Sequence, residues 1–170
     1  MSVQPVRLFG DPVLRTRADE VVEFDRELEQ LVTDLVDTMR EHEGAGIAAP
    51  QIGVSLRVFA YDCGDMFGHV VNPTYEVVGD DVQVGTEGCL SIPGVRADIR
   101  RATTVRVSGV DMHGEPVSFE CTDIMARCVQ HETDHLDGVL FLSRMEPADR
   151  KSAMRTLRDA PWLGADAGVR

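Results

Sequence analysis

Hydrophobic residues between positions 25 and 43 are spaced as on one face of a helix. They recur three or four residues apart, which places them in a single stripe along an α-helix. The stripe consists of Leu28, Leu31, Val32, Leu35, Val36 and Met39. Gly44 follows it, and glycine is typical of the position just beyond a helix end. The pattern therefore predicts an N-terminal helix that buries one face.

From residue 56 to residue 120 the pattern changes to short β-prone runs between turn-forming residues. Gly, Pro, Asn and Asp at such boundaries are typical of strands joined by short connections. The predicted strands are 56–61, 69–71, 75–78, 82–86, 103–111 and 115–121. The last two flank Met112-His113-Gly114, which predicts a hairpin.

Two further helices are predicted in the C-terminal part of the chain. One begins at Thr122, a residue type suited to the N-cap, and runs to about Leu136, where Gly138 follows. Pro147 suits the first turn of the last helix, which we expect to end near Ala160.

This order of elements favours an α+β fold in which antiparallel sheets pack around the 122–136 helix. The N-terminal and C-terminal helices complete the fold. A chain of 170 residues suits a single domain, which we place at 1–160. Residues 161–170 lack periodicity, so we expect a loosely ordered tail there.

Composition narrows the classes of function. No run reaches the roughly 18–20 apolar residues that a membrane span requires. The first residues lack a basic segment followed by an apolar run, so no secretory signal is predicted and a cytoplasmic location is expected. The net charge of −12 argues against nucleic-acid binding, including sequence-specific binding. The four cysteines form no CxxC pair and are expected to be thiols or metal ligands.

Residues 148–170 differ from the rest in carrying five basic against three acidic side chains. A solvated helix face is the simpler interpretation of this segment. Contact of the C-terminal helix with an anionic partner such as the ribosome is the alternative.

The 122–136 helix contains the pattern HExxH, from His131 to His135. Two histidines four positions apart lie on one face of a helix and can bind one divalent cation together. Glu132 lies beside the first histidine, where a general base belongs. The pattern indicates metal-assisted hydrolysis, although a helical histidine pair also occurs as an ordinary surface feature. The third ligand decides the class of hydrolase.

Two protease classes lack their third ligand here. In the metzincin pattern HExxHxxGxxH the third histidine would fall at position 141, which is Phe141. Thermolysin-like proteases use a glutamate from a later helix, but Glu146 is the last glutamate of the chain and stands too close to His135. Cys128 lies about 10 Å along the helix axis from His135, too far to share a metal with it.

Cys89 is the stronger candidate for the third ligand. It follows a predicted strand in the segment EGCLSIPG, with glycines on both sides. A Cys/His/His set leaves one coordination position open for water, as catalytic metal sites do. A small buried core residue is the alternative interpretation of Cys89.

Three motifs, taken in order, resemble those of the bacterial peptide deformylase family. Residues 44–51 read GAGIAAPQ and are similar to its GxGxAAxQ motif. Residues 87–91 read EGCLS, and residues 130–138 read QHETDHLDG, similar to QHExDHLxG. The likeness covers roughly residues 5–145, and three such motifs together are highly specific.

The resemblance implies removal of the formyl group from the N-terminal formyl-methionine of nascent polypeptides. It implies natively Fe²⁺, one per chain, with Zn²⁺, Ni²⁺ or Co²⁺ able to substitute. Cys89, His131 and His135 match the family's metal ligands. Glu132 matches the catalytic acid/base that acts with a metal-bound hydroxide.

Further residues match substrate-binding positions of the family. Gln51 and the Leu90 backbone N–H match donors to the oxyanion, and Gly46 lets an extended peptide approach closely. The resemblance places three more residues at the side-chain pocket: Ala45, Arg127 and Cys128. Ala45 and Gly85 are smaller than the residues of many members, which predicts a wider pocket and a less strict preference for methionine.

Other functions remain open on the sequence alone. They are a zinc endopeptidase, a domain with a structural metal or an inactive paralogue, and a hydrolase of a formylated small metabolite. Structural zinc sites usually have four protein ligands, and only three candidates converge here. Glu132, Gln51 and Gly46 are all present, which argues against an inactive paralogue. Deformylation of nascent chains is therefore the leading prediction.

Overall fold

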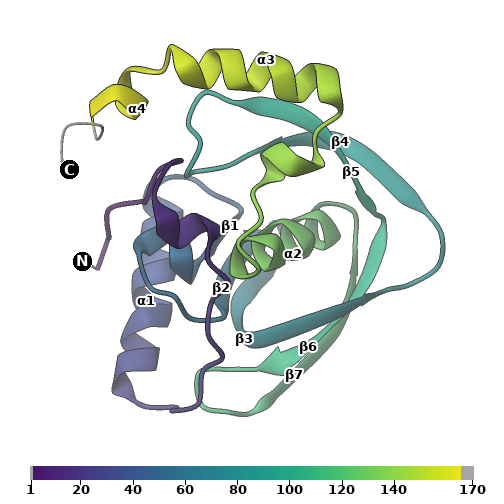
Figure 1. Cartoon of the computed structure of the whole chain (residues 1–170). Helices are drawn as coiled ribbons and strands as arrows, with labels where there is room; N and C mark the ends of the chain where they lie inside the picture. Colours follow the sequence, from purple (N-terminus) through teal and green to yellow (C-terminus); the bar gives the residue numbers. More distant parts are fainter. Residues whose placement is uncertain (1, 166–170) are drawn as a thin grey trace.

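The computed structural model describes residues 2–165 and has an α+β architecture with antiparallel sheets (Figure 1). The helices are α1 (Arg26–Glu41), α2 (Asp123–Leu136), α3 (Pro147–Arg158) and α4 (Pro161–Ala165). The strands are β1 (Gly46–Ala48), β2 (Val58–Cys63), β3 (Met66–Val77), β4 (Val82–Gly88), β5 (Arg96–Ala102), β6 (Thr104–Val110) and β7 (Pro116–Thr122). Short 3₁₀ turns lie at Pro12–Arg15, Ala49–Ile52 and Phe141–Arg144. The predicted α+β class with antiparallel sheets is confirmed.

Five strands form the larger sheet in the order β1-β2-β3-β6-β7, and every neighbouring pair is antiparallel. Strands β4 and β5 form a separate two-stranded sheet. Strand β1 therefore stands at an edge of the larger sheet, where one side of its backbone has no neighbouring strand.

The predicted N-terminal helix is α1, and it covers one face of β1 and β2. Asp25 caps it, because the Asp25 carboxylate accepts a hydrogen bond from the Leu28 N–H at 3.0 Å. Side chains alternate along β2, so Val58 and Ala60 pack against the α1 side. The buried stripe of α1 consists of Leu28, Leu31, Val32, Leu35 and Met39.

The other face of the larger sheet packs against α2. Phe59 and Tyr61 alternate with the residues that face α1 and contact the core beside α2. Every residue from Met125 to Leu136 is buried, so the polar residues of HExxH lie inside the protein. The α2 side chains in this core are Met125, Ala126, Cys128, Val129 and Leu136.

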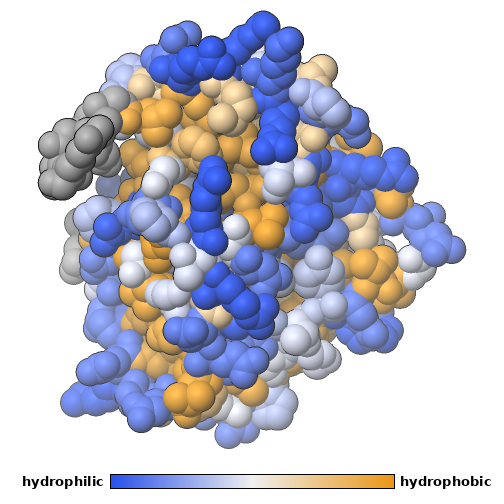
Figure 2. All heavy atoms as spheres, viewed as in Figure 1, coloured by the Kyte–Doolittle hydropathy of each residue, from blue (hydrophilic) through white to orange (hydrophobic). Residues whose placement is uncertain are grey.

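A third cluster joins the small sheet to α3. Ile99 of β5 and Leu157 of α3 are both inaccessible or nearly so. Figure 2 shows hydrophilic residues over the outer side of α3 and hydrophobic ones beneath it. The cluster holds the two-stranded sheet against α3, and β5 of this sheet also contacts α2.

Several elements differ from those that the sequence predicted. The predicted strands 69–71 and 75–78 form the single strand β3, which continues through a bulge between Val71 and Thr74. Asn72 lies in this bulge. Its side chain accepts a hydrogen bond from the Val21 N–H and donates one to the Val21 carbonyl oxygen, which anchors the bulge. Strands β1 and β5 were not predicted. Within the predicted loose tail, Pro161–Ala165 form α4, and residues 166–170 lie outside the described residues.

Over residues 2–165, the structure contains no helix that is both long and apolar enough to span a membrane.

Candidate active site

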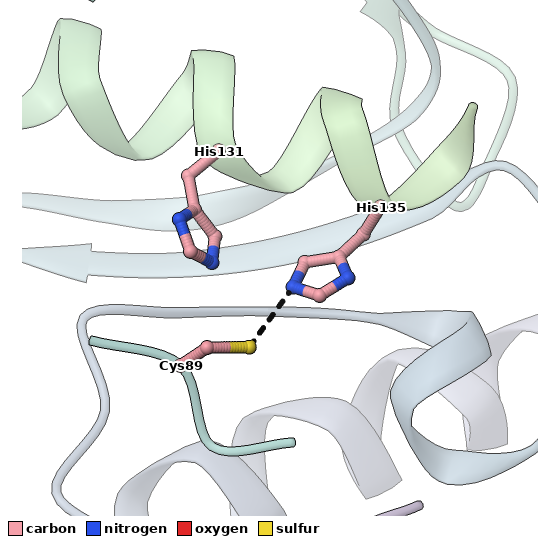
Figure 3. Close-up of side chains that lie close together, drawn as sticks. All are labelled: Cys89, His131 and His135. Carbon is pink, nitrogen blue, oxygen red and sulfur yellow. Dashed lines mark hydrogen bonds between the residues drawn. The ribbon is translucent and has the colours of Figure 1, made fainter. Parts of the chain in front are cut away.

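A thiol and two imidazoles converge where the end of β4 approaches α2 (Figure 3). Cys89 Sγ lies 3.4 Å from His135 Nε2, and His131 points to the same place. One donor atom from each of the three residues lies within 4.8 Å of the others. The structure thus brings together the three residues for which the sequence predicted metal binding. Cys128 is not part of this group among the described residues.

The donor set fits a divalent cation. Bonds of about 2.0–2.3 Å to thiolate and imidazole place neighbouring ligands of a tetrahedral metal roughly 3.5 Å apart. The 3.4 Å separation of Cys89 Sγ and His135 Nε2 agrees with that spacing. Burial lowers the pKa of His135 well below its usual range, so the ring is neutral, as a metal ligand must be.

His131 is oriented by Glu87, the first residue of the EGCLS segment. Glu87 Oε1 lies 2.8 Å from His131 Nδ1, which leaves Nε2 free for a metal. Burial opposes ionisation of Glu87, but hydrogen bonds from Arg101 and His131 outweigh it and hold the pKa of this carboxyl well below its usual range. Burial likewise opposes a charge on His131, yet Cys89 and Glu87 raise its pKa well above the usual value. The same negative neighbours favour a cation at this place.

A buried ion network extends from Glu87 away from the metal ligands. Arg101 makes two hydrogen bonds of 2.9 Å to Glu87 and one of 2.7 Å to Asp134. Asp134 in turn accepts two hydrogen bonds from Arg144. Arg127 donates to Glu87 Oε2 at 2.7 Å. Every charge of this buried group therefore has a partner, as burial requires.

Glu132 faces the site with an oxygen that has no protein partner. Its Oε2 atom is buried and accepts no hydrogen bond from the described residues. Burial raises the pKa of Glu132 to about 7. A carboxyl group with a pKa near neutrality can both accept and return a proton. The free oxygen and this pKa suit a residue that works on a water or substrate in the cavity.

Gln51 and Leu90 supply donors next to Cys89. The side-chain amide of Gln51 is held by its oxygen, which accepts the Ala48 N–H at 2.9 Å. Its nitrogen lies 3.2 Å from Ser91 Oγ and 3.8 Å from Cys89 Sγ. The Leu90 N–H has no acceptor among residues 2–165. The Leu90 N–H is thus available near the sulfur, whereas the Gln51 amide nitrogen already donates to Ser91 Oγ and Cys89 Sγ.

Gly46 of β1 lies so close to Glu132 that there is no room for a side chain at position 46. A Cβ atom at this position would come within 2.7 Å of both Glu132 Oε1 and Cys128 Sγ. Real Cβ atoms do not approach heavy atoms so closely, so only glycine fits this arrangement. The close approach of β1 to the HExxH helix therefore depends on Gly46.

A cavity of about 730 Å³ opens in front of these groups. Besides the groups already described, it is lined by Ala45, Gly85 and Arg127. Gly85 borders the cavity, and the expectation that it widens the pocket stays a prediction, although the Arg127 guanidinium lies next to Gly85. A Cβ at position 85 would lie 3.1 Å from Arg127 Nη2. Gly85 makes room for a buried arginine.

The remaining histidines lie away from the metal ligands. His113 is exposed on the β6–β7 connection, and His42 is exposed at the end of α1. His69 is half-buried, and its Nε2 accepts the Met112 N–H at 2.9 Å.

Comparison with known proteins identifies the family. Residues 3–151 match the family model described as polypeptide deformylase. The chain belongs to the polypeptide deformylase family. The peptide deformylase of Acidothermus cellulolyticus is 54% identical over 170 residues, which cover 100% of this chain and 94% of that protein. Peptide deformylase 1 of Corynebacterium glutamicum is 55% identical over 96% of this chain and 99% of that protein.

Solved deformylase structures share the fold. A peptide deformylase from Legionella pneumophila superposes with a TM-score of 0.88 at 36% identity, covering 96% of this chain and 98% of that one. The enzyme of Synechococcus elongatus, in complex with actinonin, gives 0.87 at 36% identity over 96% of this chain and 90% of that one. The resemblance that the three motifs predicted is confirmed: the chain is a deformylase-family enzyme, and this relationship supports removal of an N-terminal formyl group.

Sequence reasoning on this deformylase missed the residues behind the ligands. Glu87 and Asp134 belong to the EGCLS and QHExDHLxG motifs, but the motifs alone assign them no role, and Arg101 belongs to none of the three motifs. The only sequence signal for Glu87 was its place two residues before Cys89. Arg101 gave none, because an isolated arginine is normally a surface residue.

Proposed function

We propose that the chain is a metal-dependent hydrolase that removes the formyl group from N-terminal formyl-methionine of nascent polypeptides. The observation that carries this proposal is the convergence of Cys89, His131 and His135 with the unpartnered carboxylate oxygen of Glu132. The proposal treats α2 as the central helix, from which two of the three ligands and the acid/base project.

Cys89, His131 and His135 would hold one Fe²⁺, with Zn²⁺, Ni²⁺ or Co²⁺ as substitutes. When bound, such a cation acts as a Lewis acid that makes a water nucleophile available near neutral pH. A thiolate and two imidazoles suit these borderline metals better than Mg²⁺ or Ca²⁺, which prefer oxygen ligands. With the metal bound, Glu87 would accept the Nδ1–H of His131 and so direct Nε2 of this ring at the metal.

Glu132 moves the proton. Its Oε2 would take a proton from the attacking water as the formyl carbon becomes tetrahedral. It would then give this proton to the amino nitrogen of the departing peptide. A pKa of about 7, caused by burial, lets the same carboxyl group perform both transfers.

Gln51 and Leu90 would stabilise the negative charge that develops on the formyl oxygen. The Gln51 side-chain amide is held by Ala48 through its oxygen, and its nitrogen would exchange the long contact with Cys89 Sγ for the formyl oxygen. One preorganised donor of this kind contributes about 3–4 kcal/mol to transition-state stabilisation. The Leu90 N–H adds a second donor from the backbone.

The substrate backbone would run along β1. Because β1 is an edge strand, its free side can pair with an extended peptide. Gly46 and Ala45 leave space for the peptide there, and the 730 Å³ cavity receives its first side chain between Cys128 and Arg127. An N-terminal residue fits this arrangement, since the formyl group must reach Glu132.

The proposed partners are nascent formyl-methionyl polypeptides in the cytoplasm, where they are synthesised. Helix α3 carries four exposed basic side chains, Arg150, Lys151, Arg155 and Arg158. We include contact with the ribosome through this face in the proposal, because ribosomal RNA is an anionic surface. Cosedimentation with ribosomes, lost on charge reversal of α3, tests this part separately.

The deciding experiment measures formate release from formyl-Met-Ala-Ser. The chain is purified without oxygen in the presence of Fe²⁺ or Ni²⁺, and its metal content is determined in parallel. We expect rapid turnover with about one metal per chain, as three converging ligands predict. Full metal occupancy without formate release would overturn the proposed reaction.

Two matched cysteine variants distinguish loss of the metal from loss of the folded structure. Cys89→Ala should lose both the metal and the activity while keeping the melting temperature of the metal-free wild type. Cys121→Ala removes a buried thiol that is outside the candidate ligand group and should keep its metal.

A further inference from the structure

Two cysteines that take no part in the proposed chemical steps approach one and the same carbonyl group. Cys63 ends β2, and Cys128 lies in α2 one turn before His131. The Sγ atoms of both residues lie 3.5 Å from the carbonyl oxygen of Ala45. The two sulfurs are therefore at most about 7 Å apart, although their residues are far apart in the sequence.

The position of Ala45 explains this approach. Its carbonyl oxygen also accepts the Asp62 N–H at 2.9 Å, which extends the pairing of β1 with β2 by one residue. Helix α2 packs on the same two strands. The end of β2 and the middle of α2 thus meet at one backbone oxygen that two thiols share.

The two thiols differ in the way that a reactive and a resolving cysteine differ. Cys63 is half-buried and borders a second hollow, of about 450 Å³, on the outside of the protein. Cys128 is buried and borders the main cavity. The Cys128 thiol lowers the pKa of Cys63, whereas contact with Cys63 and burial raise the pKa of Cys128 well above its usual value. A more acidic, accessible thiol is the one that reacts first with an oxidant.

We propose that Cys63 and Cys128 form an oxidisable dithiol, which hydrogen peroxide converts into a disulfide. In the first step the Cys63 thiolate attacks a peroxide oxygen, the O–O bond breaks, and a sulfenic acid and hydroxide form. In the second step the Cys128 sulfur attacks the Cys63 sulfur, the S–O bond breaks, and water leaves with the thiol proton. Overall both thiols are oxidised and one peroxide is reduced to two waters.

The disulfide would act on the substrate side of the site. Cys128 Sγ lies next to Gly46. A Cβ atom at position 46 would contact both this sulfur and Glu132. Drawing this sulfur toward Cys63 changes the wall of the cavity next to β1. A several-fold rise in KM for a formyl peptide is expected on oxidation, and this expectation rests on the function proposed above.

Cys121, the other buried thiol, serves as an internal control. Cys121 also borders the outer hollow, but it makes no contact with the Ala45 oxygen. Burial raises its pKa to about 11, so it should react slowly. Both Cys121 and Cys128 lie near Cys63. Only Cys128 shares the hydrogen bond to the Ala45 carbonyl oxygen with it, so we expect Cys128 to be the partner.

The test treats the Zn²⁺-loaded full chain with graded hydrogen peroxide, alkylates the free thiols and maps the peptides by mass spectrometry. We expect a Cys63–Cys128 cross-linked peptide that dithiothreitol removes, with Cys121 still alkylated. Oxidation of Cys89 before any cross-link forms, or a Cys63–Cys121 link, would overturn the proposal.

Variants complete the test. Cys63→Ser should keep basal deformylation, form no cross-link and show no reversible KM change with peroxide. Cys121→Ser should still form the cross-link. A cross-link that leaves KM unchanged in an active enzyme would overturn the effect on substrate binding. Absence of basal activity in every variant and in wild type would instead count against the proposed function.

Discussion

His131 and Glu87 are joined by a 2.8 Å hydrogen bond between Nδ1 and Oε1, although 44 positions separate them in the chain. This bond ties the helix that carries the HExxH pattern to the strand that leads into Cys89. Glu87 itself is held by Arg101 and Arg127, so the orientation of the imidazole is set by buried charges. The metal ligands are therefore supported by residues that would never touch the metal.

Glu87→Gln should weaken metal binding without unfolding the chain. The amide keeps the size of the side chain but removes the charge that fixes the His131 tautomer, and such changes cost about 10–100-fold in metal affinity. Competition for Zn²⁺ against a chelator measures the effect. Glu120→Gln, which changes an exposed glutamate paired with Arg106, is the control. Equal affinities of the two variants would contradict the role of Glu87.

Glu132→Gln should keep the metal and lose activity. The amide cannot accept a proton, so kcat should fall by about 10²–10⁴-fold, the usual contribution of a general acid/base. Formate release and metal content are measured on the same sample. Hydrolysis of formyl peptides at nearly the wild-type rate would show that another group moves the proton.

Gly46→Ala should disturb the acid/base without touching a ligand. The new Cβ would approach Glu132 Oε1 and Cys128 Sγ within 2.7 Å, so the carboxylate must move. A displacement of about 1 Å in a catalytic group can cost roughly 100-fold in rate. We expect such a loss in kcat/KM with an unchanged metal content. Wild-type activity would contradict the inference that the position of the Glu132 carboxylate depends on Gly46.

The sequence alone predicted those elements and site residues whose signal lies within one short segment. The apolar stripe of 25–43 identified α1, and the four-residue histidine spacing placed two ligands on one helix face. Strand β5 escaped detection because its inward positions include Arg101, a charge that is buried only through its partners. Strand β1 has three residues, which is too short for a periodic signal.

Cys89 and the support of the ligands depend on contacts that are distant in sequence. Cys89 Sγ lies 3.4 Å from His135 Nε2 across 46 positions, and the sequence indicated Cys89 only through its place in EGCLSIPG and the joint resemblance of three motifs. The partners of Arg101 lie 14 and 33 positions away. No periodicity encodes such pairs, so the residues behind the ligands required the three-dimensional structure.

Arg127→Met should destabilise the fold more than an ordinary surface change. The Arg127 Nη1 atom donates to Glu87 at 2.7 Å and to the Ile99 carbonyl at 2.8 Å, and both bonds are buried. Buried hydrogen bonds to charged groups contribute about 1.5–3 kcal/mol, and the remaining Arg101 contact keeps the loss within this range. Urea unfolding of the metal-free chain measures it.

Arg106→Met is the matched control for Arg127→Met. Arg106 also pairs with carboxylates, those of Glu76 and Glu120, but all three side chains are exposed. Exposed ion pairs contribute little to stability, so this variant should unfold almost like wild type. Equal losses in the two arginine variants would contradict the structural role of burial around Glu87.

His69 should make the stability of the chain depend on pH in the mildly acidic range. Burial lowers its pKa, and its Nε2 accepts the Met112 N–H, which only a neutral ring can do. Because the folded pKa lies below the unfolded value of about 6.5, the unfolded state binds more protons as the pH falls. Stability should therefore be constant above about pH 7 and decline toward about pH 5.

His69→Gln isolates this contribution, because the amide oxygen can still accept a hydrogen bond but does not titrate. The difference in unfolding free energy between wild type and variant should shrink or reverse as the pH is lowered from about 7 to about 5. His42→Gln, at the exposed end of α1, controls for loss of an imidazole elsewhere. Parallel pH curves for wild type and His69→Gln would show that the Met112 hydrogen bond survives protonation or is not formed in solution.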